Sequence, residues 1–214
     1  MEQSAGVPLY EHAGGGARLT EAGQEVLGAA RRIEMSLDDC KETLEALKGI
    51  GGGQVSVGVV STAKYFAPRA LAAFTQTHAD VEMRLSVGNR SETIAGLKEY
   101  EFDFAIMGRP PEGMNVKQAV IGGHPHIIIG PPNHPMAARR NIKPAKLSGE
   151  TFLLRESGSG TRMLMQRLFE EIGVSPRSGM EIGSNETIKQ AVMAGLGIAL
   201  ISAHTVAPEL REGR

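Results

Sequence analysis

Residues 20–60 read TEAGQEVLGAARRIEMSLDDCKETLEALKGIGGGQVSVGVV, and two sequence periodicities meet inside this stretch at a run of glycines. Before the glycines, apolar or small residues recur at alternating steps of four and three, which is the heptad pattern of a coiled-coil helix. After the glycines, β-branched residues dominate, as they do in buried strands. The stretch therefore predicts a long helix, a flexible joint and the first strand of a separate unit.

The long helix should run from Glu21 to Lys48, with Thr20 as its N-cap residue. At ~1.5 Å per residue such a helix would be about 40 Å long. Its apolar seam could pack on the chain's own domain, but the strict spacing and the charged flanks favour contact between two copies of the chain. The residues assigned to this dimerisation seam are Val26, Ala30, Ile33, Leu37, Leu44 and Leu47, with Cys40 in the same register.

Length, charge and cysteine content limit what the rest of the chain can be. With 214 residues the chain can bury two modest cores beside the long helix. A net charge of -1 counts against a complete DNA-binding protein. Cys40 is the only cysteine, so neither an internal disulfide nor a cysteine-rich zinc site is expected. No signal-peptide pattern and no membrane-spanning stretch is found, so we expect a cytoplasmic protein without membrane contact.

Two series of alternating strands and helices follow the glycine joint. The first has strand patterns at 55–60, 81–87 and 102–106, and helical patterns from Pro68 and around 94–97. The second has strand patterns at 127–129, 151–155, 180–182 and 198–201, and helical patterns at 161–172 and 185–194. This alternation predicts the α/β fold class, with two doubly wound lobes behind the long helix.

Polar side chains follow the carboxyl ends of several strands, which is where ligands gather in open α/β sheets. The turn 157–162 combines hydroxyl groups and Arg162 with the N-terminus of a helix, and this suits a carboxylate or a phosphate. Its spacing is neither G-x-G-x-x-G nor a P-loop, and an ordinary capped turn is the alternative. The candidate binding residues are Ser61, Thr62, Lys64, Asn89, Arg90, Ser157, Gly158, Ser159, Gly160, Thr161, Arg162 and Asn185.

The sequence offers little for catalysis or metal binding. His124, His126 and His134 are separated by prolines and lack a companion carboxylate, so we expect no metal site. Glu156 beside an anion-binding turn could act as a base, but a single carboxylate specifies no reaction. We therefore expect neither an enzyme nor a bound cofactor, and an α/β enzyme acting on a phosphorylated substrate remains an alternative.

Several motifs resemble one family. GVPLYEH at 6–12, followed by LTEAG at 19–23, resembles the wing end of the winged helix-turn-helix of LysR-type transcriptional regulators. VGV at 57–59, DFAI at 103–106 and GLGIAL at 195–200 resemble the effector domain of the same family. Within it, STAKYFAP at 61–68 and MGRPP at 107–111 look most like the CbbR-type regulators of RuBisCO (Calvin-cycle) operons.

The resemblance implies two lobes of the type 2 periplasmic-binding-protein kind, with a small anionic effector between them. It implies a phosphorylated Calvin-cycle metabolite or NADPH as the effector, at the binding residues given above. The implied partners are further copies of the chain, as dimer or tetramer, and promoter DNA in the full-length protein, with RNA polymerase as a further candidate. A solute-binding protein of a transporter would share both lobes, but it should carry a signal peptide.

Two departures from the family pattern concern DNA binding and the chain's end. The helix-turn-helix should precede Met1, and His12 stands where an arginine that can reach the DNA backbone is usual. Arg214 comes before the last strand and helix that normally return to the first lobe. We divide the chain into a wing remnant (1–19), a linker helix (20–48), a glycine hinge (49–54), lobe I (55–122), lobe II (123–204) and the start of the return to lobe I (205–214).

Overall fold

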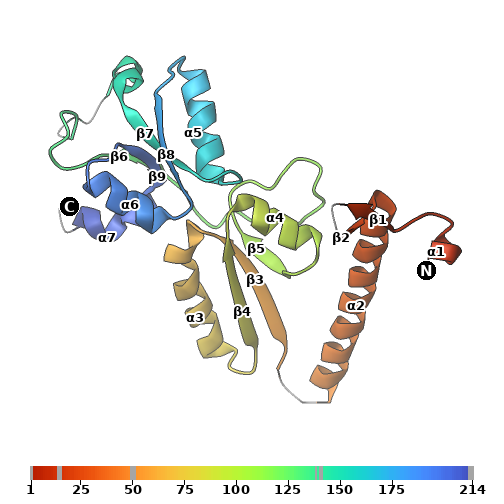
Figure 1. Ribbon diagram of the computed structural model, residues 1–214. Helices are drawn as coiled ribbons and strands as arrows, with labels where there is room; N and C mark the ends of the chain where they lie inside the picture. Colours follow the sequence, from red (N-terminus) through yellow and green to blue (C-terminus); the bar gives the residue numbers. More distant parts are fainter. Residues whose placement is uncertain (1, 14–15, 49–51, 138, 140–141, 212–214) are drawn as a thin grey trace.

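The computed structural model describes residues 2–13, 16–48, 52–137, 139 and 142–211. An N-terminal hairpin leads into a long helix, and two α/β lobes follow (Figure 1). The hairpin pairs β1 (Tyr10–Ala13) with β2 (Gly16–Leu19) in antiparallel register, after a short helix α1 (Glu2–Ala5). The long helix is α2 (Glu21–Leu47), one residue shorter than expected.

The motif at 19–23 joins the hairpin to α2. The Thr20 hydroxyl accepts a hydrogen bond from the Gly23 amide at 3.0 Å, which confirms Thr20 as the helix cap. The same hydroxyl donates to the carbonyl of Pro8 at 2.8 Å. A Cβ atom on Gly23 would lie 2.0 Å from the Leu9 carbonyl oxygen, so only glycine lets the hairpin approach the helix this closely.

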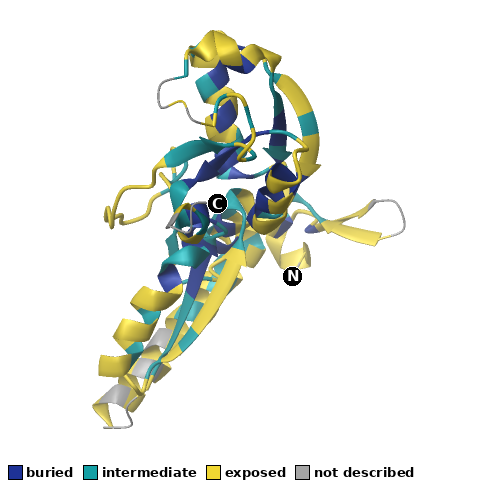
Figure 2. Cartoon of the chain, turned by 90° about the vertical axis from the view of Figure 1, so that its left-hand side faces the viewer, coloured by how far each residue is buried: buried dark blue, intermediate teal, exposed yellow. Residues whose placement is uncertain are grey.

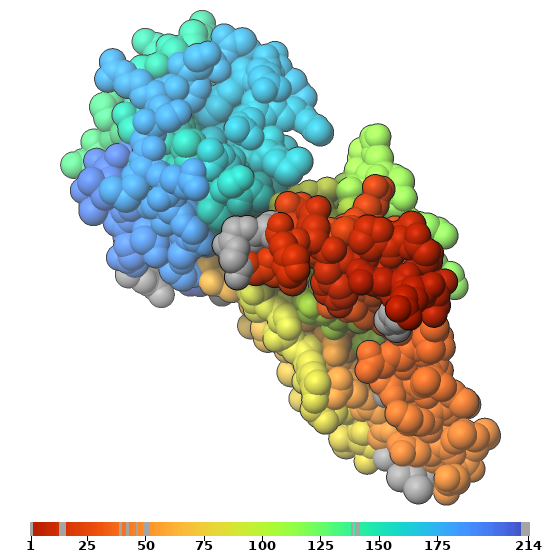
Figure 3. All heavy atoms as spheres, turned by 45° about the vertical axis from the view of Figure 1, so that its right-hand side comes forward, coloured from red at the N-terminus to blue at the C-terminus, as the bar shows by residue number. Residues whose placement is uncertain are grey.

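Helix α2 lies along lobe I (Figure 3). Its apolar seam remains largely exposed. Arg31 of α2 forms a salt bridge with Glu99 at 2.8 Å, and Arg32 lies over the ring of Tyr100 at 5.9 Å. In contrast, Ile33 is 63% exposed and Leu47 is 79% exposed. The structure therefore does not support the alternative in which the seam packs on the chain's own domain.

Lobe I is a parallel sheet in the order β4-β3-β5, with the most buried strand in the middle. Its core gathers around Val57 and Val59 of the central strand, both fully buried. The elements are β3 (Gln54–Val60), the 3-10 turn η1 (Ala63–Tyr65), α3 (Ala67–Thr77), β4 (Glu82–Gly88), α4 (Arg90–Lys98) and β5 (Phe104–Ile106).

Strand β5 is shorter than the pattern at 102–106 predicts, and Phe102 explains the difference. A Cβ atom would come within 2.4 Å of the Phe102 ring at Gly58 and within 2.3 Å at Gly96. The ring thus fills the space between β3 and α4 that these glycines leave open, and the strand begins only at Phe104.

Within the described ranges, lobe II contains four strands, two of which are longer than the sequence pattern predicts. Strands β7 and β8 are parallel, and β6 pairs with β9 in antiparallel register. Two backbone hydrogen bonds connect β7 to the residue before β9, from Leu153 to Ile198 at 2.8 Å and from Ile198 to Thr151 at 2.9 Å. The elements are β6 (His126–Ile129), the 3-10 turn η2 (Pro144–Gly149), β7 (Thr151–Arg155), α5 (Gly160–Glu171), β8 (Arg177–Ile182), α6 (Asn185–Met193) and β9 (Ala199–Ser202).

The strands of lobe II have a separate core on each face. Figure 2 shows buried segments at the centre of this lobe. Leu153 and Ile201 pack with α6 on one face. Phe152 and Leu200 pack with α5 on the other face. Because neighbouring residues of a strand point to opposite faces, this alternation confirms that helices cover both sides of the sheet, as in a doubly wound lobe.

The end of the described chain lies on lobe II. After η3 (Ala203–Val206), helix α7 (Ala207–Arg211) is held to α6 by the buried Lys189, whose Nζ donates to Glu209 at 2.6 Å. The sequence predicts the start of a return to lobe I here, and residues 212–214 of that segment lie outside the described chain.

The predicted glycine hinge is described only in part. Its residues 49–51 lie outside the described ranges, while Gly52 has a φ of 121°, a conformation that favours glycine. None of the helices in the described ranges is long and apolar enough to span a membrane.

Candidate functional site

Four side chains meet where the carboxyl ends of β3 and β7 face each other, and we call them the interlobe cluster: Ser61, Arg155, Glu156 and Asn185. Ser61 belongs to lobe I and the other three belong to lobe II. Ser61 directly follows β3, Arg155 is the last residue of β7, and Asn185 is the first residue of α6. The strand-end arrangement expected from the sequence thus brings Ser61 and Asn185 together.

The guanidinium group of Arg155 is the centre of this cluster, with 3% of the residue exposed. Its Nη2 donates to Ser61 Oγ at 3.3 Å, and its Nη1 donates to Asn185 Oδ1. Asn185 is itself 2% exposed, and its Nδ2 donates to Ser61 Oγ at 3.4 Å. One buried cation therefore contacts both lobes.

Glu156 supplies the counter-ion of Arg155. The arginine Nε donates to Glu156 Oε2 at 2.7 Å, and Nη2 donates to Oε1 at 2.9 Å, so both carboxylate oxygens accept a hydrogen bond from the same guanidinium group. Such paired contacts match the fork of the guanidinium group, and a buried charge without them would be costly. The side chain of Glu156 remains 22% exposed, which leaves this partner at the edge of the cluster.

A second polar contact joins the lobes beside the first. The Tyr65 hydroxyl of lobe I donates to Glu186 Oε1 of α6, and Lys189 donates to the other carboxylate oxygen at 2.8 Å. Burial opposes ionisation of Glu186, but the hydrogen bonds from Lys189 and Tyr65 outweigh it and keep the pKa of this carboxyl below its usual value. Burial, together with the neighbouring Glu186, raises the pKa of the Tyr65 hydroxyl.

A third contact involves the turn before α5. Gly158 has a φ of 88°, and its carbonyl accepts a hydrogen bond from the Ser91 amide of α4 at 3.2 Å. A Cβ atom on Gly158 would lie 2.9 Å from Ser91 Oγ. Glycine is therefore favoured here because of the positive φ and because Ser91 leaves little room for a side chain. The predicted turn therefore contacts lobe I directly.

Several other predicted residues have structural partners of their own. Asn89 caps α4 by accepting from the Glu92 amide at 3.0 Å, in a complete capping box. Arg90 donates to the carbonyl of Arg109 at 2.7 Å, and Ser159 caps α5. The remaining predicted residues in this region are Thr62 and Thr161, which are buried, Lys64, whose Nζ lies 5.2 Å from the centre of the Tyr65 ring, Ser157, which lies in the turn, and Gly160, the first residue of α5.

Arg162 contacts the backbone of the interlobe cluster, but its side chain is paired with Glu181. Its Nη1 donates to Glu181 Oε2 at 2.5 Å and to the backbone carbonyl of Arg155 at 2.8 Å. The hydrogen bond from Arg162 keeps the pKa of the Glu181 carboxyl below its usual value. The anion-binding role expected of Arg162 therefore has a competing partner already in place on lobe II.

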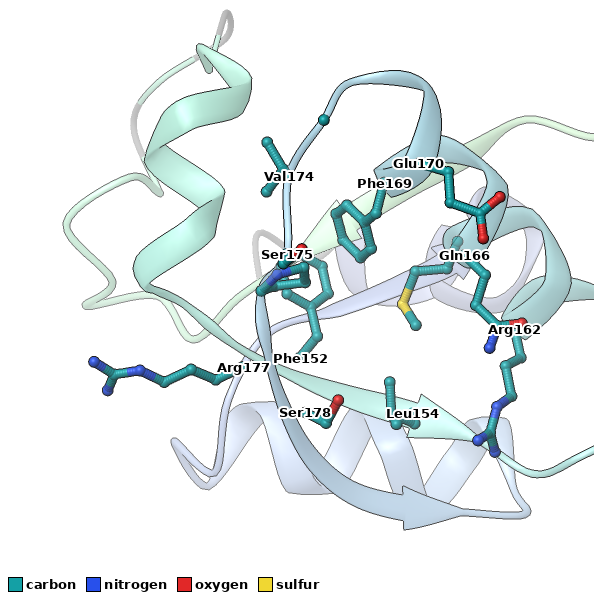
Figure 4. Close-up of a pocket in the computed structure, with 13 residues that line it drawn as sticks. Phe152, Leu154, Arg162, Gln166, Phe169, Glu170, Val174, Ser175, Arg177 and Ser178 are labelled. Atoms are coloured by element: carbon teal, nitrogen blue, oxygen red, sulfur yellow. The ribbon is translucent and has the colours of Figure 1, made fainter.

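Arg162 also lines a cavity of about 520 Å³ on lobe II, between α5 and β8 (Figure 4). Phe152 and Phe169 form part of its apolar base, while Arg177 lies at its other end. This volume would suit a small ligand, but the residues that line the cavity all belong to lobe II. It is therefore not the interlobe site that the sequence predicts.

Three imidazole rings gather near the lobe junction. The ring centre of His124 lies 4.7 Å from that of His126 and 5.6 Å from that of His204. Burial and these two neighbours lower the pKa of His124 to about 4. His134 lies elsewhere and contacts Glu150 at 3.1 Å. Within the described ranges, no group of three or more histidine, cysteine or acidic side chains is arranged to hold a metal ion.

Sequence reasoning missed the residues that do most to connect the lobes, namely Arg155, Tyr65 and Glu186. The available signal for Arg155 was a cation that ends the apolar strand TFLLR at 151–155. Such a residue normally extends into solvent, and its distant partners Ser61 and Asn185, which hold it in the junction together with Glu156, cannot be read from the local pattern.

Comparison with known proteins agrees with this architecture. The family model described as LysR substrate binding domain matches residues 49–214. The chain is 54% identical to the HTH-type transcriptional regulator CbbR of Xanthobacter flavus, over all of this chain and 65% of that protein. It is 42% identical to the RuBisCO operon transcriptional regulator of Allochromatium vinosum, over all of this chain and 71% of that protein. The chain thus spans about two thirds of the length of these relatives.

Two solved structures support the same relationship. The regulatory domain of CcmR from Synechocystis PCC6803, in complex with 2-PG, matches with a TM-score of 0.70 and 38% identity, over 72% of this chain and 74% of that one. A mutant of OxyR from Corynebacterium glutamicum, bound to H2O2, matches with a TM-score of 0.69 and 25% identity, over 96% of this chain and 66% of that one. The chain therefore belongs to the LysR family, and its two lobes have that family's type 2 periplasmic-binding-protein fold.

Proposed function

We propose that this chain is the effector-sensing and oligomerisation part of a LysR-type regulator of carbon-fixation (RuBisCO) genes, and that it binds a small anionic metabolite between its lobes. The observation that carries this proposal is the buried Arg155, which contacts Ser61 of lobe I and Asn185 of lobe II. A cation at this position can bind an anion and, in doing so, favour one arrangement of the lobes over another.

The similarity to CbbR-type regulators and to the CcmR domain with 2-PG supports the carbon-fixation assignment. The effector class we propose is a phosphorylated Calvin-cycle metabolite, with 2-phosphoglycolate as the first compound to test and NADPH as a further candidate. We propose neither a cofactor nor a catalytic activity, since the relatives are transcriptional regulators.

The signal would travel from the lobe junction to the linker helix. Lobe I contacts α2 through the Arg31–Glu99 salt bridge, and lobe I also contributes Ser61 and Tyr65 to the junction. A change in lobe arrangement can therefore alter how α2 is held. An effector does this only to the extent that it binds one arrangement more tightly than the other.

The exposed seam of α2 is the proposed contact with another copy of the chain. An apolar stripe with Ile33 and Leu37 about 60% exposed is costly in water and is stabilised when a partner helix covers it. We propose a cytoplasmic homodimer or homotetramer, with promoter DNA bound by the full-length protein and RNA polymerase as a candidate partner.

Isothermal titration of the chain with 2-phosphoglycolate, ribulose bisphosphate and NADPH tests the proposed function. Glycolate, which lacks the phosphate, is the matched control. We expect saturable binding of at least one phosphorylated compound and much weaker binding of glycolate. Absence of binding across the phosphorylated compounds would contradict the proposal.

A further inference from the structure

We propose that the carboxylate of Glu156 occupies the effector's anionic position on Arg155, so that a phosphorylated effector binds by displacing it. This inference rests on the proposed function, and it names the cation that receives the effector and the internal group that competes for it. The ligand class is a phosphate monoester or a similar compact anion with several oxygen acceptors.

The arrangement of donors around Arg155 supports this exchange. Glu156 takes the Nε and Nη2 hydrogens, at 2.7 and 2.9 Å, which is the paired contact that carboxylates and phosphates both make with arginine. Asn185 Oδ1 accepts from Nη1, on the other end of the same group. The guanidinium group is therefore held by Asn185 even when Glu156 leaves, and its paired donors stay aimed at the same position.

Burial distinguishes the two partners of this ion pair. The Arg155 side chain is 3% exposed, so removing its counter-ion without replacement would leave a buried charge. The Glu156 side chain is 22% exposed and follows Arg155 directly in the chain, so it can rotate into water. Replacing one anion by another keeps Arg155 paired and allows the released carboxylate to regain its hydration.

Neighbouring donors favour a phosphate over the carboxylate that it replaces. Ser61 Oγ lies 3.3 Å from Arg155 Nη2 and 3.4 Å from Asn185 Nδ2. A phosphate on Arg155 offers more acceptor oxygens and more negative charge than a carboxylate, so it can also accept from the Ser61 hydroxyl. Because Ser61 belongs to lobe I, this added contact would tie effector binding to the position of that lobe.

The Glu156→Gln variant tests the exchange, with 2-phosphoglycolate as the probe and isothermal titration as the measurement. Glutamine keeps the length of the side chain but loses the charge and one acceptor, so Arg155 is left with a weaker internal partner. We expect the Kd for 2-phosphoglycolate to fall about tenfold, because a charge-assisted hydrogen bond no longer competes. Glu181→Gln is the matched control, since it removes the same charge from the partner of Arg162, and its Kd should stay within about twofold of the unsubstituted chain.

Thermal unfolding provides a second readout that a purely structural role would not reproduce. Without ligand, Glu156→Gln should unfold at a lower temperature than the unsubstituted chain, since Arg155 loses its counter-ion. With saturating 2-phosphoglycolate, the variant should gain more stability than the unsubstituted chain does. A destabilised variant whose Kd is unchanged or weaker overturns the exchange and leaves Glu156 as a structural partner.

The outcomes separate this inference from the proposed function. Binding by the unsubstituted chain, without tighter binding by Glu156→Gln, supports the function and overturns the exchange. Tighter binding by Glu181→Gln instead would place the anion on Arg162. Absence of binding by the unsubstituted chain and by both variants overturns the function and the exchange together.

Discussion

Replacing Gly158 by alanine should disturb the contact between the lobes, and Gly173 offers a matched control on the same lobe. Both glycines have positive φ, 88° and 64°, so alanine at either position costs about 1 to 2 kcal/mol in backbone strain. At Gly173 nothing lies within 4 Å of the added Cβ atom. At Gly158 the added atom meets Ser91 Oγ at 2.9 Å and Ser91 Cβ at 3.0 Å, which is too close.

Rotation of the Ser91 hydroxyl can relieve the contact with Oγ, but the contact with Ser91 Cβ is relieved only by a small separation of α4 of lobe I from the turn of lobe II. We expect this to destabilise Gly158→Ala by about 1 kcal/mol or more beyond Gly173→Ala, as overpacking typically does. It should also weaken effector binding about fivefold, the factor that corresponds to ~1 kcal/mol. Gly173→Ala should leave effector binding unchanged, because its added Cβ atom meets no other group.

Urea unfolding and titration with 2-phosphoglycolate measure the two effects on the same preparations. The reasoning is refuted if the two variants have the same free energy of unfolding and the same Kd. A Gly158→Ala variant that is less stable but binds normally would show that the contact with Ser91 supports the fold without affecting the effector site.

Three further perturbations have definite expected results. Ile33→Glu combined with Leu37→Glu should lower the oligomer mass in light scattering, and an unchanged mass would place the interface elsewhere. Lys189→Met should make the free energy of unfolding less sensitive to acid. The hydrogen bond from Lys189 keeps the pKa of the Glu209 carboxyl below its usual value. This ion pair therefore stabilises the folded chain at pH values above the usual carboxyl pKa, and the stabilisation is lost as the pH falls through the lowered pKa. The same acid dependence in thermal unfolding with and without Lys189 would argue against this ion pair. The pKa of His124 is lowered to about 4, so the folded chain favours the neutral ring. Stability should therefore decrease as the pH falls from 6.5 toward 4, because the unfolded chain binds the proton more readily. The His124→Asn variant should show a smaller decrease in thermal unfolding over this range.

The sequence predicted the order of strands and helices well because local pattern determines it. The strand at 151–155 has the expected bounds, and Thr20 caps the long helix as its position before an acidic first turn suggested. The alternation of Phe102 with Phe104 predicts that both lie in a strand. The actual position of Phe102 depends on Gly58 of β3 and Gly96 of α4, and the alternation within 102–106 reveals neither contact.

The candidate site was predicted only in part, for a similar reason. Strand ends predict that Ser61 and Asn185 lie near each other, and the structure brings the two side chains together. The sequence suggested Lys64, Arg90 and Arg162 as cations for an anion, whereas the structure buries Arg155 in the junction and pairs Arg162 with Glu181. Both arginines lie close to the same strand end in the sequence, and only partners from other elements decide which one faces lobe I.

A crystal structure of the chain with 2-phosphoglycolate would test the central claim most directly. The account predicts that the phosphate lies within hydrogen-bonding distance of Arg155 Nε and Nη2, with the Glu156 carboxylate turned into solvent and Ser61 in contact with the ligand. A phosphate bound to Arg162 in the cavity between α5 and β8, with the Arg155–Glu156 pair intact, would contradict it.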